Sequence, residues 1–132
     1  MKRQSLDTNV LLRLMLQDGE QQARAAKNLV FSGKARFFVS DTAIVEFVFV
    51  LERHYSFTRE QTAYTVESML TIKSIDCNSD RIYKTLRLFT ENSSLSFEDC
   101  YLAASAEDMN ADPLWTFDVK LAKKIPAAKL LT

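Results

Sequence analysis

The apolar and polar positions along the chain follow two periods, one typical of helices and one typical of short strands. Apolar residues recur every three or four positions over stretches of about 10–15 residues, which predicts amphipathic helices. Short runs rich in aromatic and β-branched residues lie between them and predict strands. The predicted strands are 4–6, 36–39, 73–77, 113–117 and 129–131, and the predicted helices are 20–32, 42–54 and 58–70, with others beginning near Thr8, Ser79 (as a cap) and Ser96.

Polar residues at the expected helix ends support these boundaries. Ser40 and Asp41 are N-cap residues for one helix, and Thr58 with Gln61 forms the pattern of a capping box. Gly33 is placed to end the helix before it as the C′ residue. Strands that alternate with helices predict an α/β fold with a parallel sheet, in which sites lie beyond the carboxyl ends of the strands.

The composition limits the reactions that a site at the carboxyl edge of the predicted sheet could catalyse. The 132 residues predict one domain over 1–132, and 47% of them are hydrophobic, enough to form a core. The single histidine, His54, leaves little room for a zinc site or a His-centred triad, and two glycines exclude a glycine-rich phosphate loop. Two cysteines are too few for a four-cysteine metal site or a disulfide framework. Carboxylates are therefore the plentiful reactive groups.

We expect a cytoplasmic protein with no membrane segment. Asp7 and Arg13 interrupt the apolar segment behind the basic start of the chain, unlike a signal peptide. The longest apolar stretch, 43–51, contains Glu46 and is too short to span a bilayer. Cysteines without a disulfide framework fit a reducing compartment.

Two acids directly follow predicted strands. Asp7 comes after the first strand, and Asp118 comes after the strand 113–117. Because parallel strands share a polarity, we expect both acids at the same edge of the sheet. The alternative for each acid is an ordinary helix cap or turn residue.

Glu46 stands inside an otherwise apolar helix. Apolar residues cover nearly all of its circumference, and such a helix is expected to be buried. A buried glutamate must be paired, protonated or bound to a metal, and a pair with a buried cation is the alternative to a functional role. Glu46 also lies near the helix start, which is the end closest to the strand edge.

Asp99 opens a further helix, in Ser96-Phe97-Glu98-Asp99, where a plain N-terminal helix acid is the alternative. The small and apolar residues behind it pack a helix closely on a sheet and direct its first turn to the same edge. Carboxylates in contact need a counter-charge, which a hard divalent cation supplies. We therefore expect Mg²⁺ or Mn²⁺ to activate water for the cleavage of a phosphate ester.

These acids stand in four short motifs that resemble the PIN-domain family, and in particular the VapC-type toxins of bacterial toxin–antitoxin systems. Each motif alone is short, but their order, their separation and the chain length all resemble the family. The motifs are Leu6-Asp7-Thr8-Asn9, Val45-Glu46-Phe47, Phe97-Glu98-Asp99-Cys100 with Leu102-Ala103-Ala104 behind it, and Trp115-Thr116-Phe117-Asp118.

The resemblance implies a three-layer α/β/α fold with a central parallel sheet of about four or five strands. It implies a Mg²⁺- or Mn²⁺-dependent endoribonuclease toxin with Asp7 and Asp99 as principal metal ligands, and with Glu46 and Asp118 completing the acidic pocket. The implied partners are an RNA substrate, a cognate antitoxin and a second copy of the chain in a homodimer. In the family, polar residues near the acids orient the metal ligands. The residues of this chain that resemble them are Thr8, Asn9 and Thr116.

Two groups of basic residues are candidates for contact with RNA phosphates. The first group follows Asp118 and is the preferred one. The second falls at helical spacing and forms either a basic stripe for RNA or antitoxin carboxylates, or a solvated helix face. The first group is Lys120, Lys123 and Lys124, and the second is Arg81, Lys84 and Arg87.

Two further features concern the helix that carries Glu46. His54 ends that helix and is expected to be a plain C-terminal residue. With Leu11, Leu14 and Met15, the apolar residues of 42–51 offer more apolar surface than one sheet face needs. We expect part of this surface to form a dimer seam or an antitoxin groove.

Three other functions compete with the ribonuclease. A catalytically inactive PIN fold that binds RNA or acts as a scaffold is the first, and the presence of all four acids counts against it. A nuclease for DNA or flaps needs extra helices, for which 132 residues leave no room. A phosphotransfer receiver needs an early acid pair, which is missing, and Asp76 is its only candidate phosphate acceptor.

The net charge of zero first argues against a nucleic-acid partner. If four acids serve a metal, however, 13 of the 17 acids remain against 17 bases. The balanced total then describes an acidic pocket in a mildly basic shell.

Overall fold

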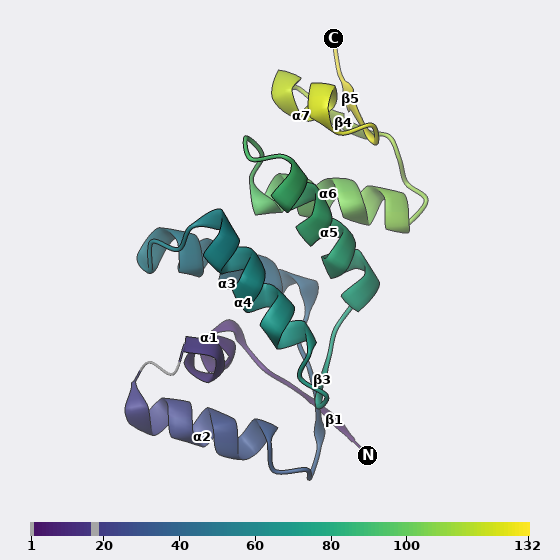
Figure 1. Cartoon of the computed structure of the whole chain (residues 1–132). Helices are drawn as coiled ribbons and strands as arrows, with labels where there is room; N and C mark the ends of the chain where they lie inside the picture. The colour runs from purple at the N-terminus through teal and green to yellow at the C-terminus, as the bar shows by residue number, and fades with distance from the viewer. Residues whose placement is uncertain (1, 17–18) are drawn as a thin grey trace. The chain divides into compact units, whose positions relative to one another are not determined.

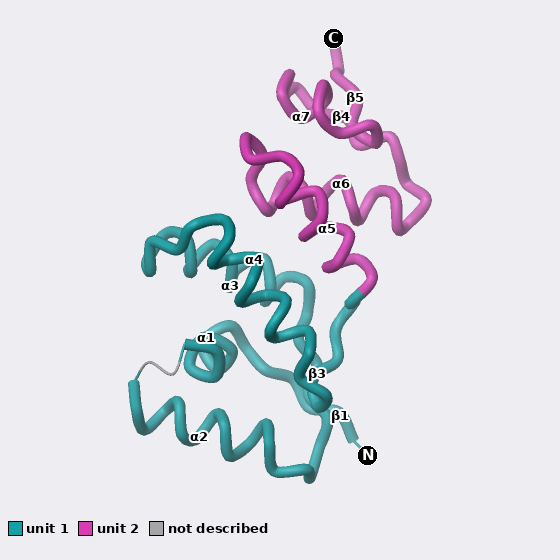
Figure 2. Tube along the Cα trace, viewed as in Figure 1, with its two compact units in different colours: residues 1–79 teal, residues 80–132 magenta. Residues whose placement is uncertain are grey.

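The computed structural model describes residues 2–16 and 19–132, and the chain divides into two compact units (Figure 2). The first unit covers residues 1–79 and the second covers residues 80–132. Each unit has its own parallel strands and its own buried residues. In the part of the chain that the structure describes, no helix has the length and apolar character needed to cross a membrane.

In the first unit, three short strands alternate with two pairs of helices (Figure 1). The strands are parallel in the order β1-β2-β3, with Gln4 beside Phe37 and Phe37 beside Ile75. This confirms the predicted alternation. The elements are β1 (Arg3–Ser5), α1 (Thr8–Leu16), α2 (Glu20–Val30), β2 (Arg36–Phe38), α3 (Asp41–His54), α4 (Arg59–Leu70) and β3 (Ile75–Asp76).

The core of this unit comes from the apolar faces of its helices. Helix α1 packs against α2 and α3, and α3 also packs against α4. All three residues of β1 are exposed, whereas Leu6 directly after it is buried. The polar sequence of β1 fits this exposure, because a strand buried on both faces would be apolar throughout. The fully buried large side chains include Leu11, Ile44, Phe47, Leu51 and Met69.

The second unit contains one parallel strand pair and three helices. Strands β4 (Leu114–Thr116) and β5 (Ala128–Leu130) pair in parallel, and α7 (Val119–Lys124) connects them. Helix α5 (Ser79–Glu91), whose first residue belongs to the first unit, and α6 (Phe97–Asp108) precede them. The rings of Phe89 and Phe97 meet edge to face with their centres 5.5 Å apart.

The predicted α/β class with parallel strands is confirmed. Among the described strands, β1, β2 and β3 form a parallel sheet in the first unit, and β4 and β5 form a parallel pair in the second.

Side-chain caps begin three helices where the sequence predicts them. The Ala43 N–H donates to Ser40 Oγ at 3.1 Å. In the Thr58 capping box, the Gln61 N–H donates to Thr58 Oγ1 at 3.1 Å and the Thr58 N–H donates to Gln61 Oε1 at 2.9 Å. Ser96 caps α6 in the same way as Ser40 caps α3. Such caps satisfy amide groups that have no partner inside the helix.

Two predicted boundary residues are wrong by a small margin. Helix α2 ends at Val30 with Phe31 as its C-cap, so Gly33, at φ +77°, lies in the following turn and is not the C′ residue. The Ser32 hydroxyl donates to the Leu29 carbonyl at 2.9 Å and closes the helix early. Ser79 is the first residue of α5 and not its cap.

Candidate functional site

Asp7 lies just beyond β1, at the start of α1. Its Oδ1 accepts a hydrogen bond from the Val10 N–H at 2.9 Å, so the residue caps the helix. The side chain is exposed, and its second carboxylate oxygen has no hydrogen bond within the described residues. Asp7 can therefore cap the helix and also bind a ligand, because Oδ1 makes the cap and Oδ2 remains available.

Thr8 fixes the start of α1 against the start of α3. Its side chain is 7% exposed, and its hydroxyl donates to the Ala43 carbonyl at 3.2 Å. Ala43 lies one helical turn before Glu46, so this contact sets the position of the Glu46 helix relative to Asp7. Asn9, the other predicted supporting residue of this motif, is exposed beside a pocket that Asp7 also lines.

The expectation that Glu46 is buried is wrong, because its side chain is exposed. Helix α3 buries one stripe, which includes Ile44, Phe47 and Leu51. Glu46 and Phe49 lie on the opposite face, where Phe49 is 54% exposed. Because solvent reaches this glutamate, it needs no buried cation and is available to a ligand as it stands.

Asp99 lies in the first turn of α6. Its backbone N–H donates to Ser96 Oγ at 3.1 Å, which forms half of a capping box. Its carboxylate is half-buried and makes no hydrogen bond within the part of the chain that the structure describes. The cap therefore uses the backbone of Asp99 and leaves both carboxylate oxygens available.

Asp118 follows β4 and caps α7. Its Oδ1 accepts from the Leu121 N–H at 3.2 Å, and its own N–H donates to Thr116 Oγ1 at 2.9 Å. Thr116, predicted to orient a ligand, thus holds the backbone of Asp118 directly. The carboxylate is exposed.

Each unit carries two of the four predicted acids: Asp7 and Glu46 lie in the first, and Asp99 and Asp118 in the second. Among residues 2–16 and 19–132, no three His, Cys, Asp or Glu side chains form a cluster that could hold a metal ion. The donor chemistry nevertheless fits a hard divalent cation, because exposed or half-buried carboxylates supply oxygen ligands.

Asp41, which the sequence predicts only as a helix cap, also lies at the carboxyl edge of the three-stranded sheet. Asp41 starts α3 shortly after β2, and its Oδ1 accepts from Asn78 Nδ2 at 3.2 Å. Burial, and the nearby charges of Asp41 and Asp76, raise the pKa of the Cys77 thiol to about 11. This thiol therefore stays protonated near neutral pH and is a poor nucleophile. The signal for Asp41 was its position after a strand, the same signal that identified Asp7.

Arg36 and Asp76 connect β2 to β3 by an ion pair. Arg36 Nε donates to Asp76 Oδ2 at 3.0 Å, and its Nη2 pairs with Oδ1. These hydrogen bonds hold the pKa of the Asp76 carboxyl below its usual range. Because both oxygens of Asp76 are engaged, the structure gives no support to a receiver-like phosphate acceptor at this position.

We expect Asp76→Asn to destabilise the protein at neutral pH and to lose this effect in acid. A carboxyl whose pKa is lowered by folding adds stability above its unfolded pKa, about 3.9, and that stability is lost as the pH falls through the folded pKa. In urea unfolding, the difference in unfolding free energy between wild type and variant should therefore be steady above about pH 5 and shrink at lower pH. The control is Glu67→Gln, at an exposed carboxylate of α4. An equal change in both variants would contradict a specific role for the pair.

The two basic groups differ in the structure. Arg81 Nη2 lies 2.7 Å from Asp108 Oδ2, and Lys84 Nζ lies 2.9 Å from Glu107 Oε1, so both side chains bind α5 to the end of α6. Two of the three members of the second group are thus paired within the second unit, and Arg87 is exposed. The first group stays exposed on α7 and forms no ion pair among the described residues, and it consists of Lys120, Lys123 and Lys124.

The apolar surplus around α3 is smaller than predicted. Leu11 and Leu14 are buried, and Phe49 is the large apolar side chain of α3 that stays exposed, with the Arg53 guanidinium 5.4 Å from its ring centre. His54 is the exposed last residue of α3, as predicted.

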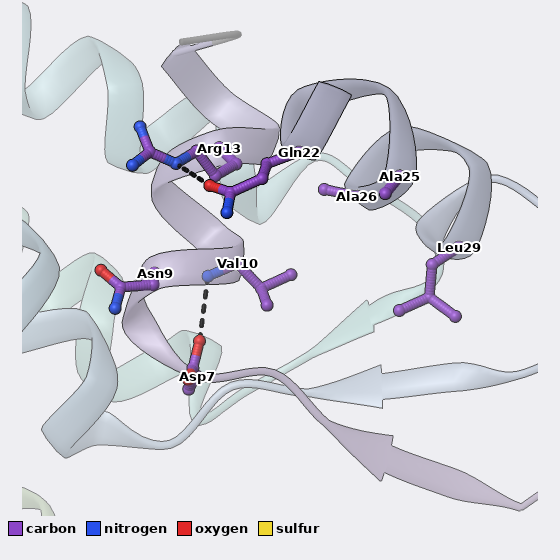
Figure 3. Close-up of a pocket in the computed structure, with 8 residues that line it drawn as sticks. All are labelled: Asp7, Asn9, Val10, Arg13, Gln22, Ala25, Ala26 and Leu29. Atoms are coloured by element: carbon purple, nitrogen blue, oxygen red, sulfur yellow. Dashed lines mark hydrogen bonds between the residues drawn. The ribbon is translucent and has the colours of Figure 1, made fainter. Parts of the chain in front are cut away.

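A pocket of about 320 Å³ lies between α1 and α2 and reaches Asp7, and we call it the α1–α2 pocket (Figure 3). Arg13 Nε donates to Gln22 Oε1 at 2.8 Å and joins the two helices at one end, with Asp7 at the other (Figure 3). Its apolar lining is Val10, Ala25, Ala26 and Leu29, and its polar lining is Asp7, Asn9, Arg13 and Gln22.

Comparison with protein families agrees with the motifs. The family model described as the PIN domain matches residues 5–125, a span that includes all four predicted acids. The chain therefore belongs to the PIN domain family, whose members are generally nucleases.

One solved structure similar to this chain is the crystal structure of VapBC2 from Rickettsia felis bound to a DNA fragment from their promoter. The identity is 20%, the alignment covers 98% of each chain, and the TM-score is 0.41. No curated protein matches the chain. The family assignment rests on the domain match.

Proposed function

We propose that this chain is the VapC-type toxin of a toxin–antitoxin system and acts as a Mg²⁺- or Mn²⁺-dependent endoribonuclease. The observation that carries the proposal is the PIN domain match over 5–125, which includes the motifs of all four acids. In this proposal, residues 1–132 form one PIN domain to which both units contribute acids.

Asp7 and Asp99 are the proposed principal metal ligands, and Glu46 and Asp118 complete the site directly or through water. Asp7 contributes the oxygen that its cap does not use, and Asp99 contributes a carboxylate with no partner in the described chain. When bound, a divalent ion lowers the pKa of water and neutralises charge that develops on the phosphodiester. Thr8 and Thr116 hold the backbone on which these ligands stand.

The proposed partners are RNA, a cognate antitoxin and a second copy of the chain, all in the cytoplasm. RNA phosphates would meet the exposed lysines of α7, Lys120, Lys123 and Lys124, which directly follow Asp118. Contacts of this type weaken as salt rises, because binding releases counterions.

The test is RNA cleavage by the full chain purified free of any other protein. We expect cleavage of total RNA at discrete positions in Mg²⁺ or Mn²⁺ and none in EDTA, followed on denaturing gels. RNA that is bound equally with and without EDTA but stays intact would instead support the catalytically inactive, RNA-binding alternative.

A further inference from the structure

We propose that the α1–α2 pocket holds one unpaired nucleobase of the RNA, in the nucleotide next to the phosphate that is cut. This inference rests on the proposed function and deepens it, because it names the part of the substrate that the chain recognises. The pocket was not among the sites that the sequence predicts.

The apolar wall of the pocket suits a flat ring. Leu29 is 44% exposed and Val10 is half-buried, so both leave apolar surface uncovered. Ala25 and Ala26 add small side chains that leave room for a planar group on α2. The volume of about 320 Å³ lies at the small end of the range for ligand pockets, about 300–1,000 Å³. Unpaired RNA bases are typically recognised by contact with their faces together with hydrogen bonds to their edges.

The polar end of the pocket supplies a hydrogen-bond donor for a base edge. Gln22 Oε1 accepts from Arg13 Nε at 2.8 Å, which leaves the amide NH₂ group of Gln22 as a donor. This NH₂ group has no partner within residues 2–16 and 19–132. Base edges carry carbonyl oxygens and ring nitrogens that accept such a bond, and guanine offers two adjacent acceptors.

The charges at the two ends favour a neutral ligand. The lining contains one acid, Asp7, and one base, Arg13, so it has no excess of either charge to select an ionic ligand. A nucleobase carries no net charge and fits such a lining. Because Asp7 is also a proposed metal ligand, a base in this pocket belongs to a nucleotide that adjoins the reacting phosphate.

Two substitutions on α2 test this recognition. Gln22→Glu keeps an acceptor for Arg13 but removes the NH₂ donor, and Ala25→Leu narrows the pocket at an exposed position. The matched controls are Gln21→Glu and Asn28→Leu, at exposed positions of α2 outside the pocket lining. On RNA oligonucleotides randomised around the cut, we expect wild type and controls to prefer one base at one flanking position. Gln22→Glu should weaken this preference roughly tenfold.

A binding measurement without metal makes the inference independent of cleavage. With methyl-labelled wild-type protein, the four ribonucleoside 5′-monophosphates are titrated one at a time, with ribose 5-phosphate as the control. We expect NMR shifts at the methyl groups of Val10, Ala25 and Leu29 with at least one base, and none with ribose 5-phosphate. Gln22→Glu should reduce these NMR shifts. The inference therefore stays testable even if Ala25→Leu does not fold.

The outcomes separate the two proposals. Methyl shifts without cleavage of any RNA would overturn the proposed function but retain a nucleotide pocket. Cleavage with no base-dependent shift and an unchanged flanking preference in Gln22→Glu would overturn the pocket and leave the ribonuclease. Shifts produced by a polypeptide partner, and by none of the nucleotides, would also overturn it and assign the pocket to that partner.

Discussion

Asparagine in place of Asp7 or Asp99 is expected to abolish RNA cleavage while the fold stays intact. The amide is neutral and binds a hard cation weakly, so the site loses charge as well as a ligand. Replacing a residue that only orients a metal ligand typically lowers metal affinity or activity by about 10- to 100-fold. Replacing a ligand itself should therefore lower the cleavage rate by more than roughly a hundredfold. Initial rates of oligonucleotide cleavage in Mg²⁺ and Mn²⁺ measure the effect.

The structure explains why these two variants should fold. Asparagine can still accept the Val10 N–H bond at the start of α1, and the cap of α6 uses Ser96 and the Asp99 backbone. Asp80→Asn is the matched control, since Asp80 is an exposed acid in the first turn of α5. Full cleavage by Asp7→Asn, with its thermal transition unchanged, would exclude Asp7 from the metal site.

Phe89→Ala is expected to cost about 3–5 kcal/mol of unfolding free energy, the usual cost of removing a buried phenylalanine. Phe89 is fully buried in the second unit and meets the ring of Phe97 edge to face. The variant removes both the apolar contacts of the Phe89 ring and its pairing with Phe97. The cavity stays largely open, because a unit of 53 residues has few other side chains to fill it. Urea unfolding followed by circular dichroism measures the change.

The same variant tests whether residues 1–132 act as one domain. If they do, Phe89→Ala and the equivalent core change Phe47→Ala in the first unit should each lower one common transition. Phe49→Ala, at a 54% exposed position, is the control and should change stability little. Two separate transitions, each sensitive to one of the core variants, would contradict the single domain.

Much of the local structure was predictable because its signals lie within a few residues. The Thr58–Gln61 capping box and the Ser40 and Ser96 caps each join positions three apart, so composition and spacing identify them. The motifs around Asp7 and Asp118 were equally visible, because each acid lies within two residues of the end of a strand and caps the next helix. The family match over 5–125 agrees with these motifs.

The environment of individual side chains was less predictable. Glu46 lies among apolar residues, yet the same helix leaves Phe49 exposed beside it. The order of apolar residues does not state which face of a helix finds a partner, so the expected burial of Glu46 was wrong. Arg81 and Lys84 had the spacing of a basic stripe, but acids of another helix pair with them.

The sequence by itself determined the α/β class, the order of strands and helices, most helix starts and the four acids that define the candidate site. These follow from local hydrogen bonds and from periodicity, which act between near neighbours. Tertiary structure alone decided which charges are paired, which acids are exposed and that a pocket adjoins Asp7. Those properties depend on contacts such as Arg36 with Asp76, 40 residues apart, and Thr8 with Ala43, 35 apart, which no local pattern encodes.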